Sequence, residues 1–112
     1  HESIKMDIDP HLAIAIAYHE SRLDKSVISS AGAVGAMQVK RIFIDCPTCT
    51  DIQAGLLALR YWLDRSSSVC DALGRYAVGT AGKCGKRSKM ILALSRDLKC
   101  TGPKKKDFCY EC

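Results

Sequence analysis

The sequence lacks any apolar run long enough to cross a membrane. The longest candidate, Leu12 to Tyr18, falls far short of the ~20 residues that a helix needs to span a bilayer. Neither a signal peptide nor an internal repeat is recognisable. The chain opens at His1 without a methionine, so we expect a mature form or an excised domain. We therefore predict a protein with no membrane-spanning helix.

Recognisable nucleic-acid and metal motifs are also missing. No nucleic-acid-binding motif is present, although the net charge is +5. His11 and His19 stand more than two turns apart on a predicted helix, too far to share a metal, so we expect no metal and no cofactor. Basic clusters at 83–89 and 104–106 suit an anionic polymer such as peptidoglycan, or are simply solvated surfaces.

Cysteine is absent from the first 45 residues and then abundant. The seven cysteines stand at positions 46, 49, 70, 84, 100, 109 and 112. This density predicts disulfides in an oxidising compartment, namely the periplasm, the cell exterior or a virion. The count is odd, so three bridges would leave one thiol free or paired with another chain, and the sequence does not choose the pairing.

Two of these cysteine pairs have C-x-x-C spacing, which leaves a metal or redox module as an alternative. The pairs are Cys46 with Cys49, and Cys109 with Cys112. The gap between them is far longer than the ~15–20 residues of a zinc ribbon, and no βαβ pattern of a thioredoxin-like site surrounds either pair. A disulfide framework is the better interpretation.

The pattern of apolar residues and caps predicts a mainly α fold, α+β at most. We expect a single compact helical domain stapled by disulfides, with a small β-hairpin or turn in 26–35, a helical turn in 36–44 and another turn at 46–49. The first helix is apolar on most sides, which is typical of a central, buried helix. Predicted helices span 11–23, 51–64, 67 or 68 to 76, and 86–98.

Glu20 is the residue with the strongest chemical signal. It continues the apolar stripe of Ile16 and Leu12 on the first helix. A carboxyl in such surroundings keeps its proton near neutral pH, because burial raises its pKa, and a general acid for glycosidic cleavage needs that property. The alternative is a surface glutamate paired with Arg22 or Lys25 in solvent.

The stretch 15–40, AIAYHESRLDKSVISSAGAVGAMQVK, resembles the catalytic core of the soluble lytic transglycosylases, which are relatives of goose-type lysozyme. Their pattern is an apolar helix ending in Glu-Ser, a loop, and Gly-Ala-x-Gly-Leu-Met-Gln; here Ala36 replaces the leucine. Weaker resemblances are found at 51–63 and 72–79, so the resemblance covers roughly 8–82. It implies a lysozyme-like catalytic domain, which we expect at 1–100. The Cys- and Lys-rich tail at 101–112 has no counterpart in the family, and its cysteines lead us to expect that disulfides pack it.

The resemblance also implies roles for individual residues. Glu20 would be the single catalytic acid and base, and the muramyl 6-hydroxyl would attack the anomeric carbon to give a 1,6-anhydro product. The substrate-binding residues would be Ser29, Met37, Gln38 and Tyr76. Met37 would pack beneath the groove or beside it, and the Tyr76 hydroxyl would lie close to the catalytic carboxyl. Trp62 could line the groove, although a lone tryptophan on an apolar helix is more often core.

One departure from the family pattern and two alternative functions stand beside this interpretation. Ala77 stands where the family usually has an asparagine, which puts activity or glycan specificity in question. A hydrolytic muramidase of the same fold would need a positioned water and usually a second carboxylate, for which Asp24, Asp45 and Asp51 are candidates. A non-catalytic peptidoglycan-binding domain is the other alternative. Either type of enzyme could act alone or within a secretion, conjugation or phage assembly.

Overall fold

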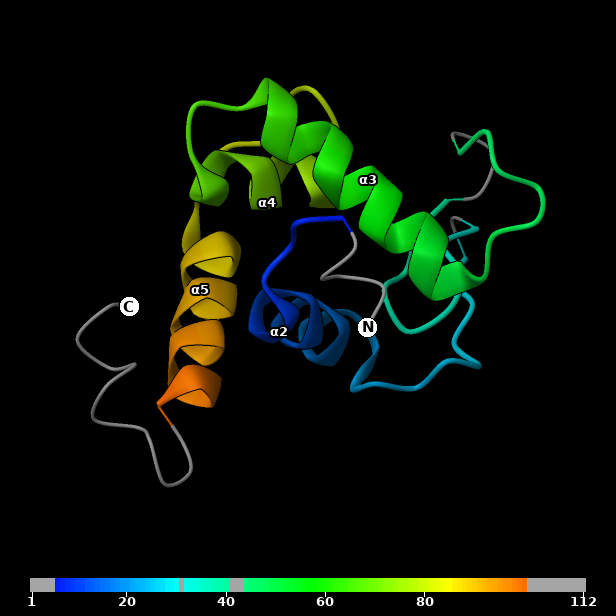
Figure 1. Cartoon of the computed structure of the whole chain (residues 1–112), viewed down its shortest axis with the longest axis horizontal. Helices are drawn as coiled ribbons and strands as arrows, with labels where there is room; N and C mark the ends of the chain where they lie inside the picture. Colours follow the sequence, from blue (N-terminus) through cyan, green and yellow to red (C-terminus); the bar gives the residue numbers. More distant parts are fainter. Residues whose placement is uncertain (1–5, 31, 41–43, 101–112) are drawn as a thin grey trace.

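The computed structural model describes residues 6–30, 32–40 and 44–100. Within these ranges the chain forms helices α2 (Pro10–Ser21), α3 (Asp51–Arg65), α4 (Val69–Val78) and α5 (Lys86–Lys99). Helix α5 packs beside α2, and α4 contacts both α3 and α5 (Figure 1). In the described part, β-structure is limited to single antiparallel bridges at 28–39. The prediction of a mainly helical domain is confirmed.

Helix α2 begins at Pro10, one residue before the predicted span, and ends at Ser21, two residues before the predicted end. The Asp9 carboxylate accepts a hydrogen bond from the His11 amide at 2.9 Å, and Pro10 occupies the first turn. At the other end, Arg22 and Leu23 adopt left-handed φ values of 57° and 68°. The Arg22 amide closes the helix by bonding to carbonyls of the last turn, so the chain leaves α2 directly after Glu20 and Ser21.

Side chains cap the starts of α3 and α4. Thr50 and Gln53 form a reciprocal capping box at the start of α3. The Ser68 hydroxyl accepts a hydrogen bond from the Asp71 amide at 3.1 Å and so caps α4. Helices α3 and α5 each run one residue beyond the prediction, and α4 runs two residues beyond Tyr76. None of the described helices is both long and apolar enough to span a bilayer.

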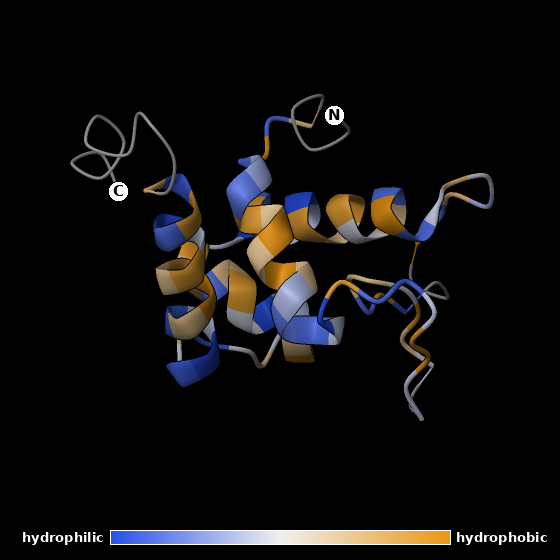
Figure 2. Ribbon diagram, turned by 90° about the horizontal axis from the view of Figure 1, so that it is seen from below, coloured by the Kyte–Doolittle hydropathy of each residue, from blue (hydrophilic) through white to orange (hydrophobic). Residues whose placement is uncertain are grey.

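Helix α2 supplies more of the core than any other helix. Ala15 and Ile16 are fully buried, and Figure 2 shows the hydrophobic residues of α2 lying among the other helices. This agrees with the prediction of a central helix. Its partners in the core come from every other described element: Ile8, Ala36, Met37, Leu56, Leu59, Leu73 and Ile91.

A glycine allows α3 to lie directly on the turn that precedes it in sequence. A Cβ atom built on Gly55 would lie 2.7 Å from the Met37 Cβ and 2.8 Å from its sulfur, far inside van der Waals contact. Met37 is 1% exposed. The close packing of Gly55 on Met37 therefore fixes the distance between α3 and the 35–38 turn.

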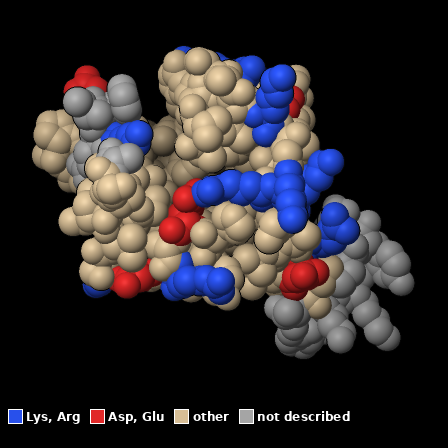
Figure 3. Space-filling model, turned by 180° about the vertical axis from the view of Figure 1, so that it is seen from behind, with Lys and Arg blue, Asp and Glu red and all other residues tan. Residues whose placement is uncertain are grey.

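Basic side chains are unevenly spread over the surface. On the face in Figure 3, Lys and Arg atoms gather mainly on the half toward α5, and acidic atoms meet basic ones near the middle. The cluster predicted at 83–89 belongs to this half, since it spans the start of α5. One face of the molecule thus carries an excess of positive charge, which favours an anionic polymer.

Two disulfides lie wholly within the described residues. Cys46 bonds to Cys49, which confirms the turn predicted there and engages both members of that C-x-x-C pair. Cys70 bonds to Cys84 and ties the start of α4 to the segment before α5. Cys100 is disulfide-bonded as well. Cys109 and Cys112 lie outside the described residues.

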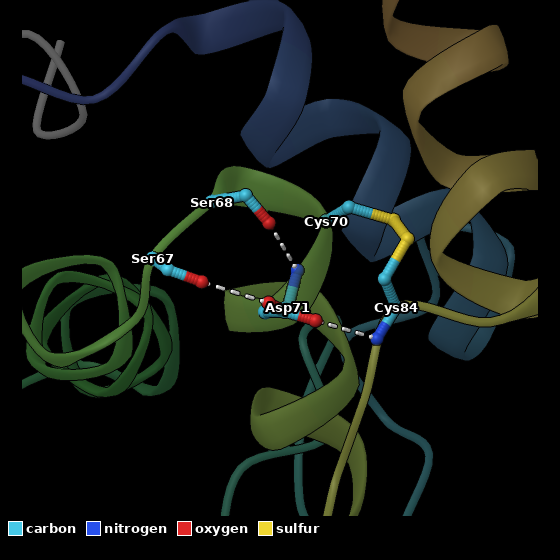
Figure 4. The surroundings of a disulfide bond; sticks show 5 residues. All are labelled: Ser67, Ser68, Cys70, Asp71 and Cys84. Carbon is cyan, nitrogen blue, oxygen red and sulfur yellow. Dashed lines mark hydrogen bonds between the residues drawn. A yellow bond between two sulfur atoms is a disulfide. The ribbon is translucent and has the colours of Figure 1, made fainter.

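The Cys70–Cys84 bridge is supported by a polar contact and by close backbone packing. The Asp71 carboxylate accepts a hydrogen bond from the Cys84 amide at 2.9 Å and another from the Ser67 hydroxyl at 3.0 Å (Figure 4). The Cys84 amide is the main cause that holds the pKa of Asp71 below its ordinary value. Nearby, a Cβ on Gly74 would lie 2.0 Å from the Lys83 carbonyl oxygen, so only glycine fits.

Candidate active site

Glu20, the penultimate residue of α2, lines a cavity of about 630 Å³. Its side chain is only 13% exposed, and its carboxylate accepts a hydrogen bond from the guanidinium of Arg87 on α5. Arg22 donates to the Tyr18 hydroxyl instead. Glu20 is therefore not the solvent-paired surface glutamate of the alternative interpretation, and its partner comes from a different helix.

The end of α2 is anchored to the turn that follows it. The Ser21 hydroxyl lies 2.6 Å from the Ala36 carbonyl oxygen and 3.1 Å from the Ala17 carbonyl oxygen, and it can donate to either. Ser21 is buried at 9% exposure. This serine thus supports the helix end beside Glu20 and holds the 35–38 turn against it.

Gln38 and Ser29 line the same cavity and also hold the loop between them in shape. The Gln38 amide donates to the carbonyl oxygens of Val27 and Gly35 at 2.9 and 2.8 Å, and its backbone adopts a left-handed φ of 52°. The Ser29 hydroxyl accepts from the Ala33 amide at 3.0 Å. Both residues therefore hold their part of the cavity wall in shape through contacts with the backbone.

Tyr76 and Met37 are joined by a hydrogen bond, but only Tyr76 lines the cavity. The Tyr76 hydroxyl donates to the Met37 carbonyl oxygen at 2.7 Å. Burial raises the pKa of Tyr76 well above its ordinary value, so the hydroxyl stays protonated at neutral pH. Met37 packs in the core below the wall. The structure thus places Met37 as a support for the groove rather than as part of its lining.

Helices α3 and α4 contribute a mostly apolar wall. Trp62 is half-buried and lines the cavity together with Ala58, Ala77 and Val78. Trp62 and Ala58 also line an adjoining cavity of about 460 Å³ that includes Tyr61. Trp62 therefore lines the cavity, although a lone tryptophan on an apolar helix is more often a core residue. Ala77, in the place of the family asparagine, presents only a methyl group to the site.

Charge in the cavity is predominantly positive. Lys40, Arg75 and Arg87 line it, and Glu20 is the only Asp or Glu among its described lining residues. Burial lowers the pKa of Arg87 from its ordinary value. The pKa of neighbouring His19 is also lowered, first by burial and then by the charges of Arg87 and Arg22. The site thus offers one carboxylate among several cations.

The three other candidate carboxylates lie elsewhere. Asp24 bonds to Ser26 at the surface, Asp45 lines only the adjoining cavity, and Asp51 packs against Gly35. In the part of the chain that the structure describes, no group of three His, Cys, Asp or Glu residues is arranged to hold a metal ion. The cavity thus brings together Glu20, Ser29, Gln38 and Tyr76, but none of these aspartates.

Arg87 and Arg75 line the cavity, although neither was expected there from the sequence. Arg87 belongs to the basic cluster at 83–89, but nothing in that cluster indicates which member turns toward Glu20. Arg75 lies in the segment 72–79, in which only Tyr76 was predicted to bind substrate. Its guanidinium donates to the Arg65 carbonyl oxygen at 2.8 Å, across the α3–α4 connection. Long-range pairing of this kind depends on how the helices pack.

Comparison with known proteins agrees with the geometry around Glu20. Residues 2–43 match the family model of the transglycosylase SLT domain. No curated protein and no solved structure matches the chain. The matched range contains Glu20, Ser29, Met37 and Gln38, whereas Trp62, Tyr76 and Arg87 lie beyond it. The resemblance to the soluble lytic transglycosylase family is therefore confirmed as a match of residues 2–43 to part of that domain.

Proposed function

We propose that this chain is a peptidoglycan lytic transglycosylase that cleaves the β-1,4 bond between N-acetylmuramic acid and N-acetylglucosamine. Glu20 protonates the glycosidic oxygen as the bond to the anomeric carbon breaks. The ionised Glu20 then takes the proton of the muramyl 6-hydroxyl while that oxygen bonds to the same carbon. The product is a 1,6-anhydromuramyl end, and no water is consumed. The attack is intramolecular, so it gains from proximity.

The observation that carries this proposal is the placement of Glu20. A carboxyl group that is 13% exposed, at the wall of a cavity of about 630 Å³, has the position that a general acid requires. The single carboxylate among the described lining residues suits a reaction in which the substrate supplies its own nucleophile.

The rest of the lining suits a glycan strand. Trp62 offers an apolar ring surface for a sugar, and Tyr76, Gln38 and Ser29 add polar residues to the same lining. Lys40, Arg75 and Arg87 give the cavity a positive field that attracts the carboxylates of peptidoglycan. The disulfides suit an oxidising compartment, and we propose the periplasm, the cell exterior or a virion as the place of action.

Digestion of purified sacculi with wild type and Glu20→Gln tests the proposal. We expect the wild type to release anhydromuropeptides, and a folded Glu20→Gln protein to release none. Asp24→Asn is the matched control, because it removes a nearby carboxylate that does not line the cavity. Mass spectrometry separates the two enzyme classes, since a hydrolytic product is heavier than the anhydro product by one water.

The products released from sacculi, and their dependence on Glu20, distinguish the candidate functions. Anhydro products that depend on Glu20 support the transglycosylase. Reducing-end products would instead establish a muramidase of the same fold. A folded wild type that binds sacculi but releases nothing would establish a non-catalytic peptidoglycan-binding domain, and clearing by Glu20→Gln would refute the role of this residue.

A further inference from the structure

We propose that Arg87 binds a carboxylate of the glycan strand, and that this exchange of partners releases Glu20 for catalysis. The inference rests on the proposed function and extends it to the recognition of substrate. It begins with the ion pair between the Arg87 guanidinium and the Glu20 carboxylate, both of which line the cavity.

The ion pair is in conflict with the chemistry expected of Glu20. A guanidinium in contact with a carboxylate favours its ionised form, and charge-assisted hydrogen bonds are the strongest kind in proteins. A general acid must carry a proton when the glycosidic bond breaks. The pair must therefore separate before Glu20 can act, and a competing anion is the direct means of separating it.

Arg87 is the member of the pair that substrate can reach. Its side chain is 43% exposed, compared with 13% for Glu20. It stands in the first turn of α5, where the helix dipole disfavours a cation and where no acidic residue offsets the charge. Arg87 thus has both a free face toward the cavity and an electrostatic reason to attract an additional anion.

A carboxylate is the anion that fits. Arginine binds a carboxylate through two parallel N–H···O bonds, and a planar guanidinium can turn from one carboxylate to another. Peptidoglycan offers two sources, the lactyl carboxylate of a muramyl residue without a stem peptide, and the carboxylates of the stem peptide itself. Arg75 and Lys40 in the same lining add to the attraction.

The exchange moves no covalent bond. The substrate carboxylate takes the place of the Glu20 carboxylate on the guanidinium, and Glu20 then accepts one proton from solvent. It hands that proton to the glycosidic oxygen as the strand is cleaved. An uncharged glycan would leave the Glu20–Arg87 pair closed, so this device makes cleavage depend on a charged substrate.

Binding measurements in the Glu20→Gln background test the inference without cleavage. Titration calorimetry compares Glu20→Gln with Glu20→Gln/Arg87→Ala on four soluble ligands: strands stripped of stem peptides, strands that retain them, and each of these two kinds after amidation of its carboxyls. We expect Arg87→Ala to weaken binding of at least one carboxylate-bearing strand roughly tenfold, and to leave binding of the amidated strands unchanged.

The same comparison identifies the source of the carboxylate. A loss on stripped strands assigns the lactyl group, and a loss confined to peptide-bearing strands assigns the stem peptide. Lys89→Ala in the same background is the matched control. Lys89 is an exposed cation on the same helix, but it does not line the cavity. We expect it to change affinity by about twofold at most.

An equal loss on charged and amidated strands, or no loss on any strand, would overturn the inference. Arg87→Gln is measured beside Arg87→Ala, since it keeps more of the side chain's packing if the shorter residue unfolds the protein. These outcomes concern affinity alone. A Glu20-dependent anhydro product together with no effect of Arg87 would therefore leave the proposed reaction standing and remove only the role of Arg87.

Discussion

The Tyr76 hydroxyl donates a hydrogen bond to the Met37 carbonyl oxygen across 2.7 Å, joining two segments that are 39 positions apart. Tyr76 lies on α4 and lines the cavity, whereas Met37 lies in the turn that also holds Gln38. The bond therefore couples the α4 wall to the loop wall. Since burial raises the pKa of Tyr76, the hydroxyl remains a donor throughout the neutral range.

Replacing Tyr76 with phenylalanine should weaken both the fold and the site. The Met37 carbonyl would lose its partner in a buried place, which costs on the order of 1–2 kcal/mol in the free energy of unfolding. We expect a lower urea midpoint with an unchanged slope, and slower release of glycan products. Tyr61→Phe is the control, because Tyr61 is 48% exposed. Equal stability of Tyr76→Phe and wild type would show that the bond contributes nothing.

Trp62→Ala should weaken glycan binding and have a smaller effect on the free energy of unfolding. Trp62 lines both cavities and is partly exposed, so part of its side chain is available to a sugar. Loss of that apolar contact should weaken binding of a peptidoglycan fragment about tenfold in the Glu20→Gln background, as measured by calorimetry.

Leu57→Ala provides the comparison for Trp62. Leu57 lines only the adjoining cavity and is 37% exposed. If strands occupy the cavity that contains Glu20, Leu57→Ala should change affinity less than Trp62→Ala. The reverse order would mean that strands bind in the adjoining cavity instead.

The Cys70–Cys84 disulfide should stabilise the domain more than Cys46–Cys49 does. Its sequence separation is 14 residues, whereas that of the other bridge is 3, and the closed loop restricts the unfolded chain more when it is longer. The chain-entropy argument gives about 3 kcal/mol for a loop of roughly 15 residues.

The matched double variants Cys70→Ser/Cys84→Ser and Cys46→Ser/Cys49→Ser separate the two bridges. Thermal unfolding of each should show the larger loss for the Cys70–Cys84 variant, because its bridge also holds the contact between the Cys84 amide and Asp71. A larger loss for the short loop would contradict the loop-length argument.

Much of the fold could be predicted because its signals are local. The starts of α2, α3 and α4 can be predicted from the sequence because the contacts that cap them span at most three residues. The residues at these starts are Asp9, Pro10, Thr50 and Ser68. The end of α2 was placed two residues late. Nothing in the composition of Arg22 and Leu23 predicts their left-handed φ values, which follow from the course of the chain toward the loop.

The candidate site was legible only where its residues belong to a motif. The motifs point to Glu20, Ser29, Gln38 and Tyr76, and these four residues line one cavity. Arg87 was not identified, because its contact with Glu20 spans 67 positions and depends on the packing of α5 against α2. Met37 packs in the core against Gly55 of α3, beneath the cavity, which is one of the two positions expected for it.

Asp9 should make the stability of the domain sensitive to acid. Its carboxylate lies 2.7 Å from the Lys99 ammonium and so ties the start of α2 to the end of α5. Burial alone would raise the pKa of Asp9, but the hydrogen bonds from Lys99 and His11 outweigh it and hold the pKa below its ordinary value of 3.8. The folded state therefore binds this proton less readily than the unfolded state does.

A pH series with Asp9→Asn tests that linkage. The contribution of Asp9 is fully present above its unfolded pKa and is lost as the pH falls below about 4 toward the folded pKa. Because the pair with Lys99 is partly exposed, we expect Asp9→Asn to cost about 0.5–1 kcal/mol at pH 7 and progressively less near pH 3. Asparagine can still cap α2, so the difference isolates the charge. Lys99→Met should give the same pH trend, and a cost that stays constant down to pH 3 would exclude the ion pair as its source.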